Sequence, residues 1–109
     1  MEKVKLYRLT EHAEQQFRKG ARQAKNITKE ALNCKMSALI YASRDRIYYS
    51  DVDGCAAFGT CLITFAQDEV IDIHWSKDDH RCGISRKEKE ALTYAYAYFG
   101  MDDNGERFL

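Results

Sequence analysis

The chain has 109 residues, of which 45% are hydrophobic and 31% are charged, and its formal net charge at pH 7 is zero. These values are ordinary for a single globular domain, 1–109, which buries about two-thirds of its unfolded surface. No apolar run approaches the roughly 20 residues of a membrane span, and MEKVKLYRLT lacks the apolar stretch of a signal peptide. We therefore expect a cytoplasmic protein with no membrane partner.

The zero net charge hides an asymmetry between the two halves of the chain. Residues 1–46 carry 11 basic and 5 acidic side chains, whereas residues 47–109 carry 6 and 12. If this asymmetry persists on the folded surface, an anionic partner would dock on the basic half. The candidate binding residues there are Lys19, Arg22, Lys25, Arg44 and Arg46. The simpler interpretation is that they are solvated faces of helices.

The first 43 residues predict a short strand followed by two helices. Residues 4–9 alternate moderately, and Thr10 is a suitable cap for a helix over 10–26, whose apolar residues recur at three- and four-residue spacing. A second helix is predicted over 28–43. Its apolar stripe of Leu32, Met36, Leu39 and Ile40 should face the core.

The stretch from Arg46 to Trp75 is rich in β-branched and aromatic residues and predicts an antiparallel meander of three strands, 46–52, 55–66 and 69–75. Asp53-Gly54 is typical of a two-residue hairpin turn, and Gln67-Asp68 is a second turn. In the last strand Ile71, Ile73 and Trp75 alternate with Asp72 and His74, so we expect one core face and one wet or functional face.

The last predicted helix covers 85–99. Ser85 and Glu88 form a capping box at its start, and Gly100 is suited to its end. Tyr94 and Tyr98 lie away from its main apolar stripe, so they either keep their hydroxyls in water or form a partner interface, where tyrosine is enriched. We expect a frayed tail over 101–109.

These elements predict an α+β fold, with two N-terminal helices packed on an antiparallel β-meander and a C-terminal helix. The largely buried core is expected to contain Phe17, Leu32, Met36, Leu39, Leu62 or Ile63, Ile71, Ile73, Trp75, Leu92 and Phe99.

Cofactor and metal chemistry find little support in the sequence. The four cysteines form no C-x-x-C pair, and free thiols in a reducing compartment are the simplest interpretation. Asp78, Asp79, His80 and Cys82 lack the second ligand pair of a closed metal site. There is no phosphate-binding glycine loop, no serine elbow and no dinucleotide fingerprint, so we expect no metal and no cofactor.

The N-terminal half contains the motifs Leu9-Thr10-Glu11-His12-Ala13, Arg18-Lys19-Gly20 and Ile27-Thr28-Lys29-Glu30-Ala31-Leu32, with residues 21–26 inserted before Ile27. In these motifs it resembles an uncharacterised branch of the RelE/ParE-like small toxin superfamily. It implies two helices on one face of an antiparallel sheet. Ribonucleases of this superfamily hold RNA phosphate with basic side chains on the sheet, but residues 56–75 contain no Lys or Arg. The fold can therefore carry over without the activity.

Two functions follow from these observations. The preferred one is a small accessory or inhibitor protein that binds a protein or ribonucleoprotein, or RNA itself, of the kind that mobile genetic elements carry. The alternative is a RelE-like endoribonuclease in which Asp72 orients His74 and His12 is the second acid–base group. Lys19, Arg44 or Arg46 would supply the cation. The simplest interpretation is that Asp72 and His74 share a surface hydrogen bond. The oligomeric state does not follow from the sequence.

Overall fold

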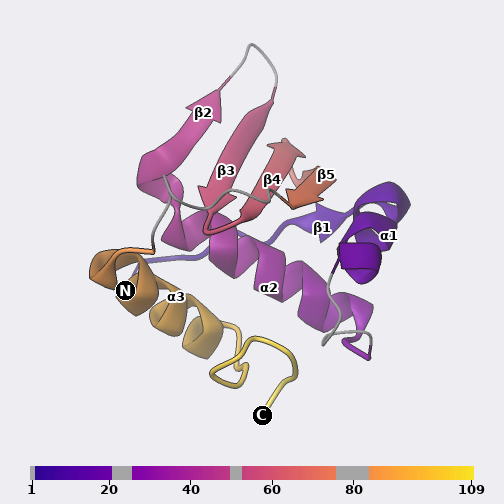
Figure 1. The fold of residues 1–109 in the computed structure, drawn as a ribbon. Coiled ribbons are helices and arrows are strands. Elements are labelled where there is room, and N and C mark those ends of the chain that lie inside the picture. The colour runs from indigo at the N-terminus through magenta and orange to yellow at the C-terminus, as the bar shows by residue number, and fades with distance from the viewer. Residues whose placement is uncertain (1, 21–25, 50–52, 76–83) are drawn as a thin grey trace.

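The computed structural model describes residues 2–20, 26–49, 53–75 and 84–109 (Figure 1). Along the chain lie β1 (Arg8–Leu9), α1 (Glu11–Gly20), α2 (Lys29–Ala42), the 3₁₀ turn η1 (Arg44–Arg46), β2 (Ile47–Tyr49), β3 (Gly54–Phe58), β4 (Cys61–Ala66), β5 (Glu69–Trp75) and α3 (Arg86–Tyr98). The chain has the predicted α+β fold. Within the described residues, no helix is both long and apolar enough to cross a membrane.

The strands form one sheet in the order β1-β5-β4-β3-β2 (Figure 1). β2 to β5 form the predicted antiparallel meander, and β1 adds a short parallel pairing to β5. The meander has four strands, so the prediction of one strand over 55–66 was wrong. Phe58 pairs with Cys61 across a turn at Gly59 and Thr60, and Gly59 has a φ of 60°, which reverses the chain there.

One of the two predicted turns is confirmed. Ala66 pairs with Glu69 around Gln67 and Asp68. The assignment of Asp53-Gly54 to a two-residue turn was wrong, because Gly54 lies in β3 and pairs with both Tyr49 and Phe65. A Cβ on Gly54 would lie 2.5 Å from the Phe65 ring, so glycine is needed there for close approach. Residues 50–52 of this connection lie outside the described residues.

A β-bulge changes which residues of β5 face the core. Thr64 pairs with Asp72 but Phe65 pairs with Val70, so Ile71 is left over in the register. Val70 and Ile73 are consequently both buried although they are three residues apart, while Ile71 is half-buried. The strict alternation predicted for Ile71, Ile73 and Trp75 was therefore wrong at Ile71.

Most of the predicted core is confirmed. Phe17, Leu32, Met36, Leu39, Ile63 and Ile73 are buried, whereas Leu62, Ile71, Trp75, Leu92 and Phe99 stay half-buried. Trp75 packs its ring against Phe17 at a centroid distance of 5.8 Å, near the surface rather than at the centre of the domain.

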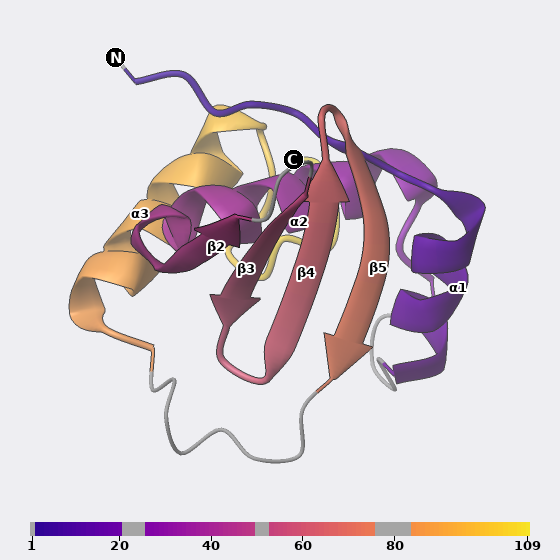
Figure 2. The ribbon, with the colours of Figure 1, turned by 90° about the horizontal axis from the view of Figure 1, so that it is seen from above.

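The three helices have different neighbours. α2 is the most buried, lies against β3 and β1, and carries α3 on its other side, whereas α1 flanks β5 (Figure 2). α1 was predicted to extend over 10–26, and its described part ends at Gly20, since residues 21–25 lie outside the described residues.

The C-terminal region begins with the predicted capping box. Ser85 Oγ accepts from the Glu88 backbone N–H, and Glu88 Oε1 accepts from the Ser85 N–H, each at 3.1 Å. Residues 101–109, for which we expected a frayed tail, instead fold back on themselves: Met101 pairs with Phe108. Lys35 Nζ on α2 donates to the carbonyl of Asn104 at 3.0 Å and fastens this segment.

Candidate interaction site

The end of α2 carries two side chains that fix each other's position. The Arg44 guanidinium lies over the Tyr41 ring at 4.3 Å from its centroid, and Arg44 Nη1 donates to the Tyr41 carbonyl at 2.9 Å. Arg44 follows Tyr41 by three residues, just beyond the end of α2 at Ala42. This spacing brings the guanidinium back over the ring. The Tyr94 ring of α3 packs against Tyr41 at 5.9 Å.

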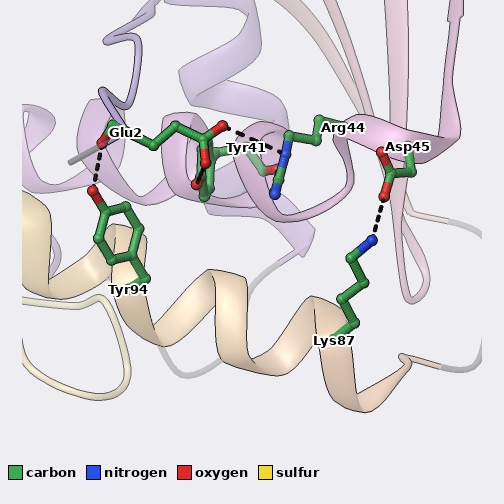
Figure 3. A network of polar contacts seen from close by, with 6 residues as sticks. All are labelled: Glu2, Tyr41, Arg44, Asp45, Lys87 and Tyr94. Atoms are coloured by element: carbon green, nitrogen blue, oxygen red, sulfur yellow. Dashed lines mark hydrogen bonds and ion pairs between the residues drawn. The ribbon is translucent and has the colours of Figure 1, made fainter.

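The N-terminal segment reaches this group with Glu2 (Figure 3). The Tyr41 hydroxyl donates to Glu2 Oε2 at 2.7 Å, and Arg44 Nε lies 3.9 Å from Glu2 Oε1. The Tyr94 hydroxyl donates to the main-chain carbonyl of Glu2. We call Glu2, Tyr41, Arg44 and Tyr94 the carboxylate cluster. Desolvation and the hydrogen bond to Glu2 raise the pKa of Tyr41, so its hydroxyl remains a donor at neutral pH.

Two pockets flank the carboxylate cluster, and Arg44 lines both. The first, of about 230 Å³, lies between the N-terminal segment, α2 and β2 and is lined by Glu2, Lys3, Lys5, Tyr7, Ser37, Ile40, Tyr41, Arg44 and Ile47. The second, of about 200 Å³, lies between η1 and α3 and is lined by Ala42, Arg44, Asp45, Ser85, Lys87, Glu88 and Ala91. An ion pair of 3.4 Å between Lys87 and Asp45 crosses beside the second pocket (Figure 3).

An aromatic row continues from the cluster along α3. Tyr98 lies 6.4 Å from Tyr94 between ring centroids, and Phe99 meets Tyr98 edge-on at 5.3 Å. Tyr98 is 45% exposed. The two tyrosines selected from the sequence therefore lie in one row, and the structure adds Tyr41 and Arg44 to it.

Lys19 and Arg44, the two basic candidates whose side chains the structure describes, lie apart. Lys19 is exposed at the end of α1, beside β5, whereas Arg44 and Arg46 lie in η1, which leads into β2 at the opposite edge of the sheet. Three strand spacings, about 14 Å, separate β5 from β2. Arg22 and Lys25, like the side chain of Arg46, lie outside what the structure describes.

The alternative catalytic residues are brought together only in part. His12 Nε2 lies 3.5 Å from Asp72 Oδ1, and the same oxygen accepts from Gln16 Nε2 at 2.8 Å. His74 is exposed two residues further along β5. Arg44 and the backbone of Arg46 lie at the other edge of the sheet, so the structure does not place the predicted cation beside the imidazoles.

No group of three or more His, Cys, Asp and Glu side chains in the described part of the chain is placed to hold a metal ion. Burial raises the pKa of the Cys61 thiol to about 12, which makes it a poor ligand and nucleophile at neutral pH.

Sequence reasoning missed Glu2, Lys3, Lys5 and Tyr41. Tyr41 lies at the end of the predicted second helix, beyond its core stripe, and Glu2 is 92 residues from its partner Tyr94. The available signal was the tyrosine content of 7 in a chain of this size, which exceeds what one packing face of α3 uses.

Comparison with models of known protein families, with curated proteins and with solved structures gave no match.

Proposed function

We propose that this chain is a small binding protein, of the accessory or inhibitor type, which contacts a protein or ribonucleoprotein partner through the carboxylate cluster and the aromatic row of α3. The observation that carries this proposal is the row of packed rings formed by Tyr41, Tyr94 and Tyr98, which begins at Arg44, a residue that lines two pockets. Tyrosine and arginine are among the residues enriched at interface hot spots.

The setting of these side chains supports the same proposal. Stacking fixes the rings before any partner arrives, and such preorganisation lowers the entropy cost of binding. The host process, a mobile genetic element in a cytoplasmic setting, is proposed by analogy with the RelE/ParE-like superfamily, whose helix-on-sheet arrangement is compatible with this α+β fold.

The test compares two single-residue variants of α3. A tagged chain is used to isolate a partner from cells, and the dissociation constant of the purified pair is then measured. Tyr98→Ala removes an exposed ring and should weaken binding at least about tenfold, as hot-spot substitutions do. Thr93→Ala, at an exposed position of the same helix, is the matched control and should leave the affinity unchanged. Equal affinities for both variants would move the interface away from α3.

The endoribonuclease remains the second candidate because His12 and Asp72 approach to 3.5 Å. A general acid or base contributes about 10²–10⁴-fold to rate, so its loss is conspicuous. Purified protein should be incubated with labelled single-stranded RNA and with ribosomes, beside His12→Ala, His74→Ala and Lys19→Gln. We expect no cleavage that depends on these residues. Cleavage that disappears in either histidine variant would replace the binding function with the enzymatic one.

A further inference from the structure

The carboxylate cluster has the contacts of a peptide-binding site that is filled by the protein's own N-terminal segment. The Tyr41 hydroxyl donates a hydrogen bond to the side-chain carboxylate of Glu2, and Arg44 forms an ion pair with it. The Tyr94 hydroxyl donates to the main-chain carbonyl of Glu2. Residues 2–7 have no helix or strand assignment before β1. Tyr41, Arg44 and Tyr94 thus bind an acidic side chain together with the backbone that carries it. This combination is suited to recognising a protein segment rather than phosphate alone.

Glu2 is held weakly at this site, whereas Tyr41, Tyr94 and Arg44 are held firmly. The Glu2 side chain is 60% exposed and that of Arg44 is 37% exposed, and exposed ion pairs contribute little to stability. Tyr41, Tyr94 and Arg44 are fixed by ring packing, by the guanidinium over the ring and by the bond from Arg44 to the Tyr41 carbonyl, none of which involves Glu2. The site therefore keeps its shape when Glu2 leaves.

The rest of the segment limits how much of the chain must move. Val4 is 5% exposed, and Lys5 is tied to Asp68 at 3.1 Å and to the Gln67 carbonyl at 3.0 Å. Displacement of Glu2 therefore requires movement only ahead of Val4.

The charge around the first pocket favours an acidic replacement. Among the described residues that line it, Glu2 is the one acidic side chain, and Lys3, Lys5 and Arg44 are basic. When residues 2 and 3 withdraw, Arg44 stays beside Tyr41 without its carboxylate, and Lys5 stays at the other end of the pocket, paired with Asp68. A segment with Glu or Asp in an extended conformation complements this charge and reproduces the contacts of Glu2.

The geometry points to a binding site for an extended acidic segment of a protein partner, which Glu2 occupies in cis in the free protein and yields to the partner. This inference rests on the proposed binding function and names the chemistry of the partner and the competitor at its site.

The test uses the full chain and two labelled peptides of equal length, hexaglutamate and hexaglutamine, in fluorescence anisotropy at low salt. Glu2→Gln keeps the shape of the side chain but removes its charge, and should bind hexaglutamate about three- to five-fold tighter than the unmodified chain. Glu11→Gln, an exposed position on α1, makes the same change in net charge and is the matched control. It should change the affinity less than about 1.5-fold, because Glu11 lies on α1, across the sheet from the carboxylate cluster, and the Coulomb energy falls with distance.

Two further variants test the groups that hold Glu2. Tyr41→Phe keeps the ring and removes the donor, and Arg44→Gln removes the cation. Each should weaken hexaglutamate binding about five-fold or more, with thermal unfolding showing that the fold is kept. Hexaglutamine should bind none of the proteins measurably. A labelled six-nucleotide RNA that binds more tightly than hexaglutamate, with the same dependence on Arg44, would overturn the inference in favour of a nucleic acid.

The outcomes separate this inference from the proposed function. Suppose that Glu2→Gln and Glu11→Gln gain equal affinity for hexaglutamate, or gain none, while Tyr98→Ala still weakens binding of the isolated partner. Only the acidic-segment inference then fails. If hexaglutamate behaves as expected but Tyr98→Ala leaves partner binding intact, the site is supported and the α3 interface fails.

Discussion

Gln16 joins α1 by hydrogen bonds to the part of β5 that β1 does not pair with. Replacing Gln16 gives a quantitative test of the fold. The Gln16 side-chain oxygen accepts from the Ile73 backbone N–H at 2.8 Å, and its side-chain nitrogen donates to Asp72 Oδ1 at 2.8 Å. β1 pairs only with Glu69 and Val70, so it does not cover the later part of β5. Gln16 therefore supplies the partner that a neighbouring strand would otherwise give to Ile73.

Gln16→Ala should destabilise the protein by about 1.5–3 kcal/mol. A part-buried N–H left without a partner costs about 1–3 kcal/mol, and the lost donor to Asp72 adds about 0.5–1.5 kcal/mol. Access of water to the site and the higher helix propensity of alanine offset part of this loss. For a domain of this size the melting temperature should fall by roughly 10 °C. Urea unfolding measures the loss, and faster hydrogen exchange of the Ile73 amide localises it.

The matched control is Gln15→Ala, an exposed position next to Gln16, which should stay within about 0.5 kcal/mol of the unmodified chain. Gln16→Glu keeps the acceptor for Ile73 but places a second carboxylate beside Asp72. Like charges raise the folded-state pKa of the pair, so the missing stability should be recovered as pH falls below about 4, where unfolded carboxylates are protonated. Equal stability of Gln16→Ala and Gln15→Ala, or a loss in Gln16→Glu that ignores pH, would refute the reasoning.

Three further predictions concern other parts of the molecule. Ser85→Ala should cost about 1 kcal/mol in urea unfolding through loss of the α3 cap, and an unchanged midpoint would contradict the capping box. Burial raises the pKa of Cys61 to about 12, so iodoacetamide at pH 8 should modify Cys61 only when the protein unfolds. Half-buried Cys55 should react earlier, and mass mapping over time distinguishes the two thiols. Backbone N–H groups of Glu106 and Asn104 hold the pKa of Asp102 below its usual value, so the C-terminal turn is stabilised above the pKa of an unfolded aspartate and loosens as pH falls through the folded value. Amide exchange of Asn104 and Glu106 should show this, and Asp102→Asn should remove most of the pH dependence.

The sequence predicted the features whose causes are local. The α3 cap depends on Ser85 and Glu88, three residues apart, and the turn at Gln67 depends on a few neighbours. The break at Gly59 was missed because Cys61, Ile63 and Phe65 continue an alternating pattern after it. The bulge at Ile71 was missed for a similar reason: its cause is the shift in pairing between β4 and β5, which the letters of β5 do not show.

Three residues of the candidate site, Arg44, Tyr94 and Tyr98, were predicted from the sequence. Tyr94 and Tyr98 lie away from the main apolar stripe of α3, and the sequence of that one helix is enough to show this. Tyr41 and Glu2 acquire their role from contacts 39 residues apart in the chain, and Tyr94 meets Glu2 across 92 residues. No periodicity connects such positions. Of the predicted basic patch, Lys19 and Arg44 lie apart, because belonging to the same half of the chain does not place two residues side by side on the sheet.

The position of Arg44 is the structural argument for preferring the proposed binding function over the endoribonuclease. A cation that stabilises a phosphorane must lie about 3 Å from the developing charge. Arg44 lies in η1, which leads into β2, and three strand spacings of about 14 Å in total separate β2 from β5. On α1 itself, Arg18 is paired with Glu14 at 3.0 Å, and Lys19 lies two turns beyond His12, about 10 Å along the helix. The Asp72 carboxylate beside His12 also repels a phosphate. Arg44, in contrast, already holds a carboxylate together with Tyr41, so the described side chains favour recognition of an acidic group over cleavage of RNA.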